Sequence, residues 1–88
     1  MAINRNKVGT FRIQEIIIED QPEVVLDIMS RVIVLKANYL DIEGAFEYYG
    51  YSEMFDEVAF GDIVPEYVFT ITRHPKLGFY LTDVRRRN

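Results

Sequence analysis

Residues 66–84 are the segment that most narrows the folds open to this chain. Residues 66–73 alternate, with Tyr67, Phe69 and Ile71 on one face, which is the period of a strand that buries one side. A short stretch containing a proline and a glycine follows at 74–78, and residues 79–84 are again typical of a strand. When two strands are joined by such a short turn, they pair antiparallel. We therefore expect a β-hairpin at residues 66–84.

Residues 31–40 and 43–51 predict two more strands. The first opens with a continuous apolar run at 32–35, which is typical of a central strand covered on both faces. The second alternates and so divides its side chains between two faces. One of these faces carries the acids and two of the tyrosines: Glu43, Glu47, Tyr49 and Tyr51.

The N-terminal third predicts a strand followed by a helix. Residues 10–19 include three consecutive isoleucines, whose branched side chains favour a strand. Asp20 can then cap a helix, because Pro22 suits a first turn and Glu23 stands three residues after the cap. An apolar stripe follows, formed by Val24, Val25, Ile28 and Met29. Its two valines leave an extended conformation open for residues 21–30.

These elements predict an α+β fold, with an antiparallel sheet of four to five strands and one short helix. Eighty-eight residues suit a single domain spanning residues 1–88. At this size a folded chain buries about 64% of its unfolded surface, which is enough for one core of marginal stability.

The composition excludes several classes of protein. The chain has no cysteine, so neither a disulfide framework nor a thiolate metal site can form. No apolar run approaches the length of a membrane span. Arg5 and Lys7 lack the apolar stretch that follows them in a signal peptide, so we expect a soluble protein that acts in the cytoplasm.

Residues 37–72, the acidic segment, hold eight acids and no Lys or Arg. The acids are Asp41, Glu43, Glu47, Glu53, Asp56, Glu57, Asp62 and Glu66. Residues 1–12 carry a net charge of +3 and residues 73–88 one of +4. Three interpretations stay open: the basic ends fold over the acidic segment, both are simply solvated, or the acidic segment steers a basic partner.

The sequence contains no known catalytic or ligand-binding motif. His74 lies in a predicted turn without an orienting partner. Ser52 lacks the second glycine of a nucleophile elbow and suits helix capping instead. The acids and the single glycine at 56–62 match no calcium loop, and no glycine-rich phosphate loop is present. We therefore expect no enzyme, and we assign no catalytic, cofactor or metal residues.

Nucleic acid is not the expected main partner. Arg85, Arg86 and Arg87 form a short basic run that can contact phosphate, but the isoelectric point is near 4.9. The eight acids would repel a phosphate backbone, even where tyrosines offer stacking surfaces.

Four short segments resemble small uncharacterised proteins of tailed bacteriophages. They are RVIVLKA at 31–37, YYGYS at 48–52, FDEV at 55–58 and PEY at 65–67. The resemblance covers residues 31–67 and implies a phage or prophage origin, and hence the cytoplasm of a bacterial host. No activity is assigned to those proteins, so it implies no residue role. Small acidic phage proteins often bind a host enzyme, and carboxylates can imitate the phosphate spacing of DNA.

The leading hypothesis is a non-enzymatic module that binds another protein through an acidic, tyrosine-rich surface. The predicted contact residues are Glu43, Glu47, Tyr49, Tyr51, Glu53, Asp56, Glu57 and Asp62. One alternative is a structural or homo-oligomeric module, in which tyrosine-rich strand faces pair between copies. Another is a small ligand-binding domain whose site forms between subunits.

Overall fold

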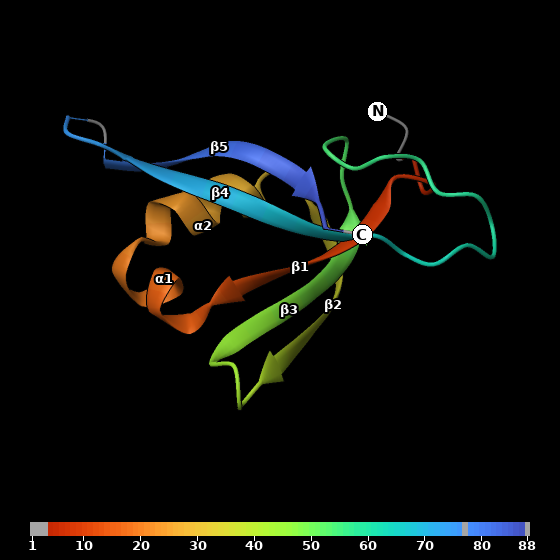
Figure 1. Cartoon of the computed structure of the whole chain (residues 1–88), viewed down its shortest axis with the longest axis horizontal. Coiled ribbons are helices and arrows are strands. Elements are labelled where there is room, and N and C mark those ends of the chain that lie inside the picture. The colour runs from red at the N-terminus through yellow and green to blue at the C-terminus, as the bar shows by residue number, and fades with distance from the viewer. Residues whose placement is uncertain (1–3, 77, 88) are drawn as a thin grey trace.

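The computed structural model describes residues 4–76 and 78–87, with the side chains of 79, 80 and 82 left aside. Seven elements follow one another along the chain (Figure 1). They are β1 (Val8–Gln14), α1 (Glu15–Asp20), α2 (Pro22–Met29), β2 (Ile33–Leu40), β3 (Ala45–Tyr51), β4 (Glu66–His74) and β5 (Gly78–Arg86). The α+β class and the five strands are confirmed, whereas the described residues form two short helices rather than one.

The five strands form one sheet in the order β2-β3-β1-β4-β5. β3 is antiparallel to both β1 and β2, and β5 is antiparallel to β4, but β1 and β4 run parallel. The sheet is therefore mixed, and the prediction of a purely antiparallel sheet is wrong. Hairpin turns force antiparallel pairing, but 51 residues of chain separate β1 from β4, so the tertiary fold decides their relative direction.

Both helices lie on the same face of the sheet, and α2 passes behind β4 and β5 (Figure 1). Phe11 and Ile13 of β1 meet Val24 and Ile28 of α2 in the core, and Phe11 and Ile28 are completely buried. Phe11 is the centre of an aromatic group, with ring centroids 4.8 Å from Phe69 and 5.3 Å from Tyr48. The opposite face of the sheet, which we call the open face, carries no helix.

Residues 15–20 form α1, so the prediction of a strand over the three isoleucines is wrong. β1 ends at Gln14, and the Glu15 amide donates to the Gly44 carbonyl at 2.9 Å. Ile17 and Ile18 then turn toward the core cluster, while Ile16 stays exposed. Partial burial of these two side chains against the core outweighs the small strand preference of isoleucine.

The helix expected after Pro22 is confirmed as α2, and the extended alternative is excluded. Val24 and Ile28 are buried and Val25 and Met29 are partly buried, as the apolar stripe predicts. The cap assignment is wrong, because Asp20 ends α1 and Gln21 takes the cap position without a side-chain hydrogen bond. Pro22 begins the new helix because its missing N–H needs no partner there.

β2 confirms the strand predicted at 31–40 but contradicts its central placement. It lies at the edge of the sheet, and every residue from Ile33 to Tyr39 is exposed. In the apolar run only Val32, just before the strand, is buried. An apolar run of this kind predicts a covered strand only if the topology brings layers to both faces, and here the helices lie over the other end of the sheet.

The hairpin predicted at 66–84 is confirmed by β4 and β5. His74 pairs with Gly78 across the turn, and Gly78 adopts a φ of 79°, which glycine tolerates without strain. His74 is of intermediate exposure, and its Nδ1 accepts a hydrogen bond from the Lys76 amide at 3.1 Å. Residue 77 of the predicted turn lies outside the described residues.

Candidate interaction surface

The open face is organised around Arg12. Because Phe11 and Ile13 point into the core, strand alternation turns Thr10 and Arg12 to the other side. The pairing of β1 with β3 then sets Arg12 directly opposite Glu47 and Thr10 opposite Tyr49. The face predicted for the acids of residues 43–51 is thus the open face, and it meets an arginine from the basic N-terminal end.

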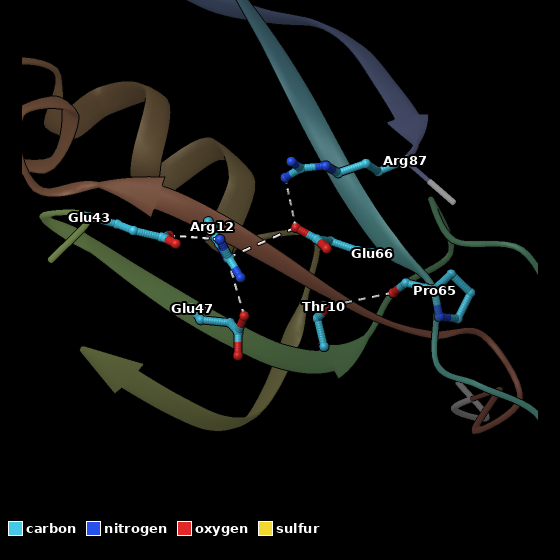
Figure 2. A network of polar contacts seen from close by, with 7 residues as sticks. All are labelled: Thr10, Arg12, Glu43, Glu47, Pro65, Glu66 and Arg87. Carbon is cyan, nitrogen blue, oxygen red and sulfur yellow. Dashed lines mark hydrogen bonds and ion pairs between the residues drawn. The ribbon is translucent and has the colours of Figure 1, made fainter. Parts of the chain in front are cut away.

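Arg12 bridges three carboxylates of the acidic segment (Figure 2). Its Nη1 lies 2.7 Å from Glu43 Oε2, and its Nε lies 3.2 Å from Glu47 Oε2 and 3.9 Å from Glu66 Oε1. From the other end of the chain, Arg87 Nη1 reaches the same Glu66 oxygen at 3.1 Å. The hydrogen bond with Glu47, and the charges of Glu43 and Glu66, raise the pKa of Arg12.

The N-terminal residues bind a second part of the acidic segment. Lys7 Nζ lies 3.0 Å from Glu53 Oε2, and Asn4 Nδ2 donates to Glu57 Oε1 at 3.1 Å. Backbone hydrogen bonds reinforce this contact, from the Ser52 amide to the Lys7 carbonyl and from the Val58 amide to the Asn6 carbonyl. The interpretation that the basic ends fold over the acidic segment is therefore confirmed for Glu43, Glu47, Glu53 and Glu66. Glu57 instead contacts the uncharged amide of Asn4.

The eight predicted contact residues fall into two separate groups. Glu43 and Glu47 lie at the Arg12 network, and Tyr49 and Tyr51 continue the same face of β3, half-buried. The other four stand beyond β3 in the segment that leads to β4: Glu53, Asp56, Glu57 and Asp62. The structure thus confirms that Glu47, Tyr49 and Tyr51 share a strand face, but it does not join them to the acids of the loop.

The loop at residues 56–64, which we call the presented loop, holds two large apolar side chains that are not among the predicted contact residues. Phe60 is fully exposed and Ile63 is 83% exposed. Gly61, with a φ of 89°, and a hydrogen bond from the Asp62 amide to the Ala59 carbonyl shape the turn between them. In Figure 1 this loop extends away from the sheet. Its signal in the sequence was the pair of apolar residues inside a stretch rich in loop-forming residues.

A small cavity opens where β4 separates from β1. The two strands pair at only two positions, Thr10 with Glu66 and Phe11 with Tyr67. Beyond them lies a space of about 240 Å³, with Ile13, Ile17, Phe69 and others as its walls and the charged residues Arg12, Glu66 and Arg87 among its lining. It is smaller than the roughly 300–1,000 Å³ of typical ligand pockets, and these charged residues bind one another.

Two tyrosines are expected to ionise at a higher pH than a tyrosine in an unfolded chain. The Tyr39 hydroxyl donates to Glu15 Oε2 at 2.8 Å, and this hydrogen bond raises the pKa of Tyr39, while burial raises the pKa of Tyr48. Each folded phenol keeps its proton at a pH where the unfolded chain loses it, so the stability they contribute is present below pH of about 10 and lost as pH rises further. An ultraviolet titration of phenolate should therefore show two late transitions.

Two variants assign these transitions. Tyr39→Phe should remove one of them, and Glu15→Gln should move it to lower pH without changing the Tyr48 transition. Ionisation of Tyr39 or Tyr48 at the pH of an unfolded-chain tyrosine would contradict the hydrogen bond or the burial.

Two further kinds of site are absent from the described residues. No three His, Asp or Glu side chains gather there as a metal site would require, and no helix there is long and apolar enough to cross a membrane. No protein-family model, curated protein or solved structure matches this chain.

Proposed function

We propose that this protein is a non-enzymatic module that binds another protein through the presented loop. The observation that carries the proposal is the exposure of Phe60 and Ile63 next to the carboxylates of Asp56, Glu57 and Asp62. Single exposed apolar residues are common, but two large ones in one turn resemble the apolar anchors that dominate protein interfaces. An acidic rim around such anchors suits a partner with an apolar pocket bordered by Lys or Arg.

Both ends of the presented loop are firmly held. Before it, Phe55 is buried and stacks on Tyr67 with ring centroids 4.4 Å apart, and the Tyr67 hydroxyl accepts a hydrogen bond from the Asp56 amide. After it, Pro65 is buried and its carbonyl accepts from the Thr10 amide at 2.9 Å (Figure 2 shows both residues). Fixed ends reduce the entropy that the loop loses on binding, which favours recognition.

The charges that remain for a partner lie in the presented loop rather than on β3. Glu43 and Glu47 are compensated by Arg12, whereas Asp56 and Asp62 form no ion pair with any described residue. The contact surface that we propose is therefore narrower than the predicted one, with Tyr49 and Tyr51 at most on its margin. The resemblance to tailed-phage proteins makes a protein of the bacterial cytoplasm the first partner to seek.

The proposal is tested with the double variant Phe60→Ala/Ile63→Ala. Proteins retained from bacterial lysate by the immobilised wild type should be lost by this variant and kept by Leu26→Ala, which removes an equally apolar, 70% exposed side chain from α2. For the purified partner we expect a loss of affinity of about 10- to 100-fold, because interface anchors contribute roughly 1–3 kcal/mol on truncation.

Charge provides a second measurement with the same partner. Asp56→Lys/Asp62→Lys should slow association and remove most of its salt dependence, because rim charges act mainly on the encounter rate. Partners that bind the loop variants and the wild type alike would refute the proposal, provided that thermal unfolding shows all variants to be folded.

A further inference from the structure

β2 leaves one side of its backbone open. It pairs with β3 alone in the described sheet, so the N–H and C=O groups on its outer side meet no strand (Figure 1). Its side chains are apolar on both faces, and Ile33, Val34, Leu35 and Tyr39 are 40–49% exposed. An edge of this composition is a template for another strand.

The two edges of the sheet differ in how they are protected. β5, at the far edge, carries Asp83, Arg85 and Arg86, charges of the kind that natural sheets use to prevent edge pairing. β2 has a single charge, Lys36, in its eight residues. It has one irregularity, between Val34 and Lys36, so its regular part comprises residues 36–40.

We propose that β2 pairs antiparallel with β2 of a second copy of this chain, about a two-fold axis at Asn38. A two-fold axis normal to the sheet keeps the open faces of both copies on the same side. Because opposed residues in an antiparallel pair share a face, the axis must pass between two copies of the same residue. Asn38 is the middle of the regular part, and this register keeps all of residues 36–40 in the pair. The two sheets then become one of ten strands.

This register brings complementary groups together. Lys36 lies opposite Leu40 of the second copy and next to its Asp41, and neither Lys36 nor Asp41 forms an ion pair with a described residue of its own chain. The Asn38 side chains meet at the axis, where two amides can hydrogen-bond each other. A parallel pair in register would instead set Lys36 against Lys36, which is unfavourable.

The same register also brings apolar groups together. Ala37 falls opposite Tyr39 of the second copy, and Tyr39 is 46% exposed in the single chain. Pairing therefore removes part of this ring from water, which adds a hydrophobic contribution to the backbone hydrogen bonds.

Cysteine cross-linking tests both the pairing and its register. The chain has no cysteine, so Asn38→Cys introduces one thiol that meets its own copy at the axis. Opposed Cβ atoms in an antiparallel pair lie about 4.5–5.5 Å apart, within reach of a disulfide after small adjustment. Under mild oxidation we expect Asn38→Cys to form covalent dimers at least ten times faster than Asp83→Cys, which carries its exposed thiol on β5.

The unmodified chain provides an independent measurement. Sedimentation of the wild type between about 1 µM and 1 mM should show a monomer–dimer equilibrium. Asn38→Lys, which sets two ammonium groups against each other, should weaken the dimer at least tenfold, while Asp83→Lys and Phe60→Ala/Ile63→Ala should leave it unchanged. The last variant separates this dimer from the binding proposed for the presented loop.

Two results would overturn the inference. A wild type that stays monomeric up to 1 mM, with Asn38→Cys no faster than Asp83→Cys, would exclude the pairing. Faster cross-linking at Ala37→Cys than at Asn38→Cys would exclude the register centred on Asn38.

Discussion

Replacing Phe11 with alanine is expected to lower the free energy of unfolding by about 3–5 kcal/mol, the range for removing a fully buried phenylalanine. The Phe11 ring contacts three others, Tyr48, Phe55 and Phe69, which come from β3, the segment after β3, and β4. The cavity left by alanine would therefore weaken the packing of β1 against its neighbours on both sides. A domain of this size has little stability beyond that loss, so we expect a large unfolded population.

Urea unfolding followed by circular dichroism measures this loss. The matched control is Phe60→Ala, the same chemical change at a fully exposed ring, which should alter the free energy of unfolding by less than about 0.5 kcal/mol. Equal effects of the two substitutions would contradict the core described for β1.

Gly50→Ala is expected to destabilise the chain by about 1–3 kcal/mol, because a side chain there overpacks the junction of β3 and β2. A Cβ at this position would overlap the Ile33 carbonyl oxygen and lie 3.2 Å from Val32 Cγ1. The closest atom belongs to the backbone, so no rotamer change relieves the overlap. β2 would have to shift away from β3 and lose pairing at its first residues.

Hydrogen exchange locates this effect. Amides of β2 and β3 should exchange faster in Gly50→Ala, whereas those of the β4–β5 hairpin should keep their protection. Gly44→Ala is the control, since nothing lies within 4 Å of its Cβ, and only its φ of 60° carries a cost of about 1 kcal/mol. Uniform loss of protection, or none, would contradict the crowding at Gly50.

The elements that the sequence predicts well are those set by neighbouring residues. The β4–β5 hairpin follows from alternation and a turn of few residues, and α2 follows from Pro22 and an apolar stripe at helical spacing. The face shared by Glu47, Tyr49 and Tyr51 follows from the period of a strand alone. These features depend on distances of a few residues, where local geometry leaves little choice.

The errors concern elements whose conformation or position depends on distant segments. Ile16 to Ile18 became helical because packing against the core outweighs a small intrinsic preference. β2 lies at an edge because β3 inserts between it and β1, which its apolar run does not reveal. The parallel pairing of β1 with β4 likewise joins segments that share no turn.

For the candidate site, the sequence by itself determined the residue types and their spacing. These are eight acids in one segment, basic ends, and aromatic rings spaced along strands. Only the tertiary structure decided which acids are compensated, because Arg12 and Arg87 reach Glu43, Glu47 and Glu66 across strands far apart in the chain. It also decided that much of the apolar surface left exposed lies on β2 and the presented loop. Charge and alternation are properties of the chain, whereas exposure and pairing depend on which segments the fold brings together.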